Sequence, residues 1–235
     1  AAPGLVYQRG HPKGLFYLVF TEAWERFSYY GMTALLVLYM VNQLLLPGHV
    51  EHIAGFAGFR AALEPVVGPL SPQALASQLF GLYSGFVYFT PLVGGLIADR
   101  WIGQRNAVVI GALSMSGGHL AMAFEQTFLV ALLLLVVGSG LLKGNIAAQV
   151  GALYPRKEEA SRTRGYAIFS TAINFGAVAG PLFCGLLAQV YGRYYGLGVA
   201  AIIMLGGLAT YLSGYRLLPA GVPRRTHEGG TLGSA

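Results

Sequence analysis

The chain has 235 residues, of which 55% are hydrophobic and only 10% are charged. Soluble domains carry about 25% charged residues, so this composition excludes a soluble protein and predicts an integral membrane protein in a lipid bilayer. The net charge of +6 would admit a nucleic-acid partner, but the basic residues are scattered among connections, so no nucleic-acid binding is expected.

Six apolar segments are each long enough for a helical crossing, which needs about 20 residues. They cover residues 14–44, 74–100, 104–123, 127–153, 163–190 and 194–218. The alternation typical of barrel strands does not occur. We therefore expect an all-α integral membrane fold, a six-helix bundle over residues 14–218. Residues 1–13 would form a cytoplasmic arm, and the glycine-rich stretch 219–235 is typical of a flexible tail, a linker or a cloning remnant.

The longest connection, residues 45–73, is rich in proline and includes a piece, His49–Glu64, that could form a short interfacial helix. Ser71 and Pro72 are expected to cap and begin the second crossing.

Basic residues are concentrated in alternate connections, which by the positive-inside rule places both termini in the cytoplasm. The compact loops favour a bacterial inner membrane. The residues that decide the topology are Arg9, Lys13, Arg100, Arg105, Arg156, Lys157, Arg162, Arg164, Arg216, Arg224 and Arg225.

Three charged residues lie within five positions of the first crossing, namely Glu22, Glu25 and Arg26. A charge at bilayer depth costs at least roughly 2.5–3.5 kcal/mol, so such a cluster usually marks a polar cavity or an ion pathway. With Tyr29 and Thr33 the three share one helical face, and Glu22 can pair with Arg26 four residues later. A carboxylate here could exchange a proton. The alternative is an ion pair that only holds the bundle together.

Lys143 lies deep in the fourth crossing, farther from the cytoplasmic end than a lysine stem easily reaches. It could meet Glu22, Glu25 or a substrate carboxylate, or it could form a buried structural pair. With Arg26, these four charges sum to zero, which suggests mutual pairing around one cavity.

The connection Gly94–Arg105 predicts a tight cytoplasmic turn between the second and third crossings. Its acid could cap the next helix, and its arginines could form a charge relay, so we expect a conformational role rather than binding. The residues concerned are Gly95, Asp99, Arg100, Gly103 and Arg105.

Uncharged polar side chains inside the crossings are further candidates. Asn174 lies mid-helix and would either bond a neighbouring helix or contact a ligand. Tyrosine rings could line a pocket, although tyrosines near helix ends are usually interface anchors. The tyrosine candidates are Tyr29, Tyr30, Tyr83 and Tyr88. No Cys/His spacing suggests a metal site. We find neither a nucleophile–base pair nor a cofactor motif, so an enzyme is not expected.

The run from Glu22 to Met32, Glu-x-x-Glu-Arg-Phe-Ser-Tyr-Tyr-Gly-Met, resembles the first-helix motif of the proton-dependent oligopeptide transporters, a family of the major facilitator superfamily. The resemblance implies proton coupling by Glu22 and Glu25, and a peptide-binding role for Arg26. Many family members carry a basic residue just after this motif, where this chain has Thr33.

Other segments are similar to the same family. The segment around Lys143 resembles its Leu-Lys-Pro-Asn signature, with Gly144 in place of proline, and implies contact with the carboxyl end of a peptide. Asn174 matches an asparagine that touches the peptide backbone. Tyr30 and Tyr88 match positions that shape the peptide pocket. The turn Gly94–Arg105 resembles the loop motif of the whole superfamily.

The resemblance spans about residues 11–217 but only the first half of the family fold, a bundle of three plus three helices. It implies the N-terminal half of a proton-coupled di- and tripeptide symporter, with protons as the coupling ion and no other cofactor. We expect this half not to transport alone, and its partner to be a C-terminal six-helix half or a second copy. Two alternatives stay open, a non-transporting half that assembles with a partner and a half for another substrate, such as nitrate or a drug.

Overall fold

The computed structural model describes residues 7–8, 10–155, 157–219 and 221. Within them the fold consists of long helices, which confirms the predicted all-α membrane bundle. Arg9, Arg156, Arg224, Arg225 and nearly all of the predicted tail lie outside the described residues. The long helices are α1 (Lys13–Tyr39), α3 (Pro72–Ile97), α4 (Gln104–Ala121), α5 (Phe128–Ala152), α6 (Glu159–Tyr191) and α7 (Arg193–Gly214).

Short elements connect and extend these helices. Ser71 caps α3 as predicted, because its hydroxyl accepts a hydrogen bond from the Ala74 amide and Pro72 begins the helix. The arm before α1 contains a two-residue antiparallel pairing that the apolar pattern did not predict. The short elements are β1 (Tyr7–Gln8), β2 (His11–Pro12), the π-helical η1 (Met40–Leu44) and η3 (Ala98–Ile102), the 3-10 segments η2 (Val50–His52), η4 (Glu125–Thr127) and η5 (Tyr215–Leu217), and α2 (Phe56–Val67).

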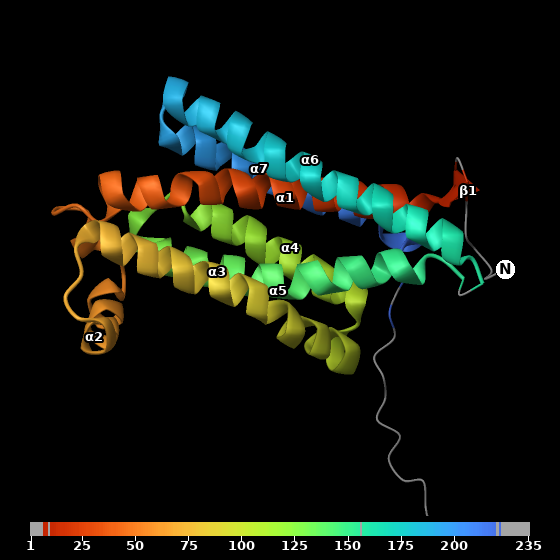
Figure 1. Cartoon of the computed structure of the whole chain (residues 1–235), viewed down its shortest axis with the longest axis horizontal. Helices are drawn as coiled ribbons and strands as arrows, with labels where there is room; N and C mark the ends of the chain where they lie inside the picture. The colour runs from red at the N-terminus through yellow and green to blue at the C-terminus, as the bar shows by residue number, and fades with distance from the viewer. Residues whose placement is uncertain (1–6, 9, 156, 220, 222–235) are drawn as a thin grey trace, which may run out of the picture.

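Four segments of the described chain are long and apolar enough to cross a membrane, judged by length and composition. They are Pro72–Ile102, Glu125–Ala152, Glu159–Tyr191 and Arg193–Leu217. Helices α1 and α4 are not among them, and α1 includes the three charges of the first crossing. These two helices nevertheless lie alongside the apolar ones in the same bundle (Figure 1).

The six long helices form two layers of three, and the order of their contacts is symmetric. Figure 1 shows α6 and α7 along one side of α1, with α3, α4 and α5 on the other side. Helix α1 packs on α6 and α7, α5 packs on α3 and α4, and α4 contacts α7. If α1, α3 and α4 are matched in order with α5, α6 and α7, the contacts of α1 map onto those of α5, and the contact of α4 with α7 maps onto itself. This is the pattern of the predicted three-plus-three repeat.

Glycines allow the closest helix approaches in both layers. At the crossing of α3 and α5, a Cβ added to Gly94 would lie 2.1 Å from the carbonyl oxygen of Gly140. At the matching crossing of α1 and α6, a Cβ on Gly180 would lie 2.3 Å from the carbonyl oxygen of Phe27. Small residues of this kind let backbones touch in a membrane, where apolar burial gives little drive for helix association.

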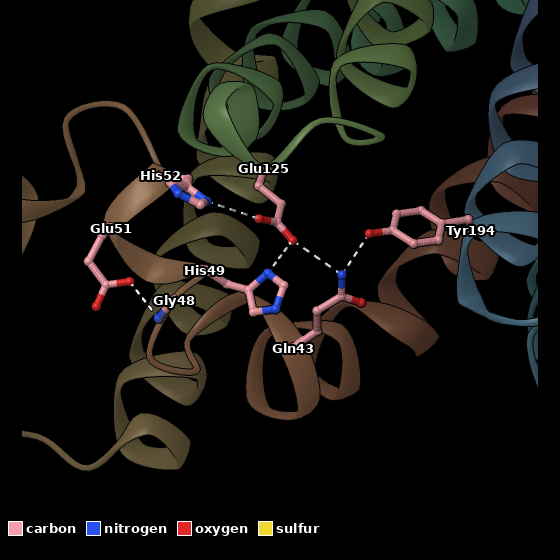
Figure 2. Close-up of polar contacts among 7 residues, drawn as sticks. All are labelled: Gln43, Gly48, His49, Glu51, His52, Glu125 and Tyr194. Atoms are coloured by element: carbon pink, nitrogen blue, oxygen red, sulfur yellow. Dashed lines mark hydrogen bonds and ion pairs between the residues drawn. The ribbon is translucent and has the colours of Figure 1, made fainter.

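One end of the bundle is tied together by a polar cluster around Glu125, drawn in Figure 2. Glu125 Oε1 lies 2.8 Å from His49 Nδ1 and accepts a 3.2 Å hydrogen bond from the Gln43 amide. That amide nitrogen also lies 2.6 Å from the hydroxyl of Tyr194, and His52 Nδ1 lies 3.9 Å from Glu125 Oε2. The carboxylate of Glu125 on η4 therefore joins η1 and the long connection, and the Gln43 amide links η1 to the start of α7.

Replacing Glu125 by alanine is expected to loosen the connection 46–54. The variant loses the contacts of Glu125 with His49 and Gln43, which together stabilise the connection by about 1–3 kcal/mol. Because this loss makes local opening easier, hydrogen exchange in the connection should become roughly 5- to 150-fold faster. Exchange of the amides of residues 46–54 measures this. The control is Glu64→Ala on α2, whose carboxylate accepts from the exposed Arg60. Unchanged exchange in Glu125→Ala would show that other contacts, such as the Ala54 amide to the Gln126 carbonyl, hold the connection.

Candidate functional site

The three charges of α1 form one buried ion cluster. Arg26 Nε lies 2.7 Å from Glu22 Oε1 and 2.8 Å from Glu25 Oε2. Glu22, Glu25 and Arg26 are only 2%, 0% and 8% exposed. The predicted pairing of Glu22 with Arg26 across one helical turn is thus confirmed. The neighbouring Glu25 reaches the same guanidinium, so a single cation serves two carboxylates.

The cluster leaves carboxylate oxygens available. Among the described residues, Glu22 Oε2 and Glu25 Oε1 are buried without a hydrogen-bond partner. Buried polar atoms are normally hydrogen-bonded, and exceptions often mark functional groups or bound water. Two carboxylates that share one guanidinium carry an excess negative charge, which could be neutralised by a proton or by a further cation. The arrangement is therefore chemically suited to exchange a proton.

Lys143 comes from α5 and lies over aromatic rings. Its Nζ is 4.2 Å from the centroid of the Tyr29 ring and 5.6 Å from that of Tyr88, which places it in cation–π contact with both. The Tyr29 ring also stacks on Tyr83, with centroids 6.4 Å apart, and meets Tyr30 edge-on at 5.1 Å. The structure thus brings Lys143 together with all four predicted tyrosines.

The predicted ion pair between Lys143 and the glutamates of α1 is wrong for this conformation. No ion pair in the described part of the chain joins Lys143 to Glu22 or Glu25, although all three interact electrostatically. The physical reason is competition. Arg26 lies on the same helix as both carboxylates and reaches them at hydrogen-bond distance, while the ammonium of Lys143 finds the ring faces of Tyr29 and Tyr88.

Several candidates lie on the exposed side of this site. Tyr88 is 70% exposed, Asn174 is exposed and Tyr30 is half-buried. Within the described residues, no hydrogen bond connects Asn174 to the Lys143 cluster. Its helix nevertheless touches α1 at the same level, because a Cβ added to Gly176 would lie 2.6 Å from the Cβ of Arg26. Asn174 is therefore at the height of the ion cluster, on the open side of the bundle.

The turn between α3 and α4 differs from its predicted form. Asp99 is exposed and does not cap α4, whose N-cap is Gly103 with a φ of 77°, a left-handed conformation that favours glycine. Arg100 is also exposed, and a Cβ on Gly95 would meet open space. Asp99 lies within η3, five residues before α4 begins at Gln104, so the cap prediction is wrong. Arg105 instead donates to the Leu218 carbonyl and lies 5.1 Å from the centroid of the Tyr215 ring.

Sequence reasoning missed one buried polar pair. Gln149 of α5 and Tyr211 of α7 are fully buried, with the Gln149 amide nitrogen 2.8 Å and its oxygen 3.0 Å from the Tyr211 hydroxyl. A glutamine inside an apolar run was the available signal, since an amide at bilayer depth needs a partner on another helix. This pair joins two helices on the same side of the bundle as Arg105.

The described residues also contain no group of three His, Cys, Asp or Glu side chains that could hold a metal.

Comparisons with known proteins agree with this geometry. The sequence profile of the family described as "POT family" matches residues 105–226, about half of the chain. The chain is 38% identical over 205 residues to "Uncharacterized transporter YclF" of Bacillus subtilis (strain 168), covering 86% of this chain and 37% of that protein. It is 36% identical over 208 residues to "Di-/tripeptide transporter" of Lactococcus lactis subsp. lactis (strain IL1403), covering 87% and 38%.

Solved structures give the same result. A crystal structure of a peptide transporter POT in complex with sulfate matches with a TM-score of 0.76 and 34% identity, covering 94% of this chain and 43% of that one. A POT family transporter in complex with 5-aminolevulinic acid matches with a TM-score of 0.75 and 29% identity, with the same coverage. This chain thus spans less than half the length of these relatives.

The fold and the buried charges define an integral, multi-pass membrane protein of the transporter type. The chain belongs to the POT family.

Proposed function

We propose that this chain supplies one half of a proton-coupled di- and tripeptide symporter that works by alternating access. The observation that carries the proposal is the ion cluster of Glu22, Glu25 and Arg26 buried close to Lys143, a cation without a carboxylate partner among the described residues. Support also comes from relatives called di-/tripeptide transporters and from the related structure with 5-aminolevulinic acid, a ligand with an amine and an acid.

A short peptide is a zwitterion, so its site needs a cation for one end and acids or amides for the other. Lys143 and Arg26 would attract the peptide carboxylate, and Asn174 would bond the peptide backbone. The rings of Tyr30 and Tyr88 would form a forgiving wall for varied side chains. The second half of the fold would supply the remaining contacts.

Protons would act as the coupling ion, without another cofactor. A proton on Glu22 or Glu25 neutralises one carboxylate and weakens its hold on Arg26. The guanidinium then becomes available to the peptide carboxylate. Because the loaded and empty sites favour different pairings of Arg26, proton and peptide together would bias the equilibrium between two conformations. The turn with Gly95, Asp99, Arg100, Gly103 and Arg105 would act in that conformational change rather than in binding.

The partner of this half would be a C-terminal six-helix half, or a second copy in a homodimer. Helices α3 and α6 keep long rows of large apolar side chains exposed, among them Leu92, Phe175 and Leu182. Such surface must face lipid or another bundle. We place the protein in a bacterial inner membrane with both termini in the cytoplasm, since most basic residues of the connections lie at one end and only Arg60 and Arg193 at the other.

The test uses a transporter of the relatives' full length that carries these residues, reconstituted in liposomes. Glu22→Gln and Glu25→Gln should abolish accumulation of labelled dialanine driven by a proton gradient while exchange at equal concentrations persists. Lys143→Ala should raise the KM about 10- to 150-fold, because a hydrogen bond to a charged group contributes about 1.5–3 kcal/mol. The matched control is Glu64→Gln on the exposed face of α2.

If all three variants keep proton-driven accumulation, the coupling assignment is wrong. Competition of dialanine uptake by nitrate or a drug would favour a different substrate. Uptake of dialanine by liposomes that hold only this chain would contradict the proposal that one half is inactive. Mass measurement of the native complex separates a homodimer from an assembly with another half.

A further inference from the structure

The side chain of Lys143 occupies a place defined by two aromatic rings from different helices. Tyr29 belongs to α1 and Tyr88 to α3, and the ammonium lies 4.2 Å from the centroid of the first ring and 5.6 Å from that of the second. We call these two rings the aromatic cradle. A cation over a tyrosine face is attracted by the negative face of the ring, and the attraction grows where water is excluded.

The two walls of the cradle differ in rigidity. Tyr29 is buried, and its ring is held by the stacked ring of Tyr83 and by the edge contact with Tyr30. Tyr88 is 70% exposed and lies on the open side of the bundle. Lys143 therefore rests against one packed ring and one exposed ring.

The carboxylates next to the cradle are already engaged. Glu22 and Glu25 both contact Arg26 Nε, at 2.7 and 2.8 Å. If Lys143 were free to reach them, the attraction between opposite charges would exceed the attraction to a ring, because it acts between full charges. The ammonium of Lys143 instead rests over the face of the Tyr29 ring. In the described part of the chain the ammonium of Lys143 thus lies over the rings and forms no ion pair with either carboxylate.

We infer that Tyr29 is a positioning residue whose ring holds the ammonium of Lys143 away from the glutamates and presents it to an incoming carboxylate. The cradle is the resting place of the lysine, and a ligand carboxylate draws the ammonium from the rings into an ion pair. The first part of this inference stands on the geometry alone. The second part, capture of a carboxylate, rests on the proposed function.

Three lysines in the whole chain make a direct test possible, namely Lys13, Lys143 and Lys157. The chain is labelled with carbon-13 lysine, placed in lipid nanodiscs and studied by NMR, with Lys143→Arg to assign the signal. Protons above a ring are shielded, so the ε-methylene signal of Lys143 should lie upfield of the other two. Tyr29→Leu should remove most of this shift, and Tyr29→Phe, which keeps a ring, should restore it.

Tyr88→Leu should remove a smaller part of the upfield shift of Lys143, since that ring is farther from the ammonium. The control is Tyr191→Leu, an exposed tyrosine of α6 whose ring pairs with Tyr195. It should leave the Lys143 signal in place. If the Lys143 signal of the unmodified chain lies at the same position as those of Lys13 and Lys157, the inference that Lys143 rests in the aromatic cradle is wrong.

Two ligands test the resting place of Lys143 separately from its capture of a peptide carboxylate. Dialanine, which has a free carboxylate, should move the Lys143 signal downfield as the ammonium leaves the rings, whereas dialanine amide should not. An upfield signal that responds to Tyr29→Leu, but not to dialanine even in a transporter of the relatives' full length, would support the cradle and count against capture of a peptide carboxylate. A similar response to both ligands would overturn the carboxylate part of the inference.

Discussion

Replacing Arg26 by alanine is expected to lower the free energy of unfolding of the bundle by about 3–5 kcal/mol, because it leaves buried charges without their partner. Glu22 and Glu25 are almost inaccessible, and each loses a contact shorter than 3 Å. Thermal unfolding in detergent micelles, followed by circular dichroism, measures the loss. The triple change Glu22→Gln, Glu25→Gln and Arg26→Leu removes all three charges and should recover most of the stability.

Arg60→Ala provides the matched control. Arg60 Nε lies 2.6 Å from Glu64 Oε1 at the same four-residue spacing, but the two side chains are 46% and 35% exposed. An exposed ion pair contributes about 0–1 kcal/mol, so this variant should unfold almost like the unmodified chain. Equal losses in Arg26→Ala and Arg60→Ala would mean that burial does not decide the strength of the α1 cluster.

Replacing Gly94 by alanine should cost about 1–3 kcal/mol of stability, or more, because the added methyl group meets backbone that cannot move aside. Its Cβ would lie 2.1 Å from the carbonyl oxygen of Gly140 and 2.9 Å from the amide nitrogen of Leu141. Helices α3 and α5 would have to separate, which also disturbs Lys143 on α5. Thermal unfolding and the cross-linking of cysteine pairs placed across the two helices measure the effect.

The same helix offers the comparison. Gly81 and Gly85 also belong to α3, and a Cβ at either would meet nothing within 4 Å. Gly81→Ala and Gly85→Ala should therefore cost no stability and should gain up to about 1 kcal/mol, because alanine favours a helix more than glycine does. A loss in these variants as large as that of Gly94→Ala would point to a general cost of alanine in α3 rather than to the crossing.

The sequence specified the class of fold because the length and apolar character of each crossing are local properties. It specified the Ser71 cap for the same reason. It placed helix ends less well, as α6 begins at Glu159, four residues before the expected crossing at 163. The apolar pattern detects the part of a helix inside the membrane, whereas the helix continues into water. The partners of each helix depend on distant glycines that face each other, such as Gly94 and Gly140, and no local pattern specifies them.

For the candidate site, spacing predicted the pair of Glu22 and Arg26, since residues four apart share a helix face. It could not predict that Glu25 shares the same guanidinium, because adjacent residues do not face each other and only the long arginine side chain joins them. Counting charges suggested Lys143 as a counter-ion, but a count ignores competition from aromatic rings. The roles of these residues in binding and proton coupling stay predictions.

The pairing of α1 with the last two helices has a consequence for biosynthesis. The ribosome makes α1 before its packing partner α6, which begins at Glu159, 120 residues after α1 ends at Tyr39 (159 − 39). At about 5–20 residues per second, α1 waits roughly 6–24 s for that partner. Its carboxylates and its guanidinium lie on one helix and pair as soon as that helix forms. Helix α1 can therefore enter the bilayer with its guanidinium already paired and one excess negative charge left, before Lys143 has been synthesised.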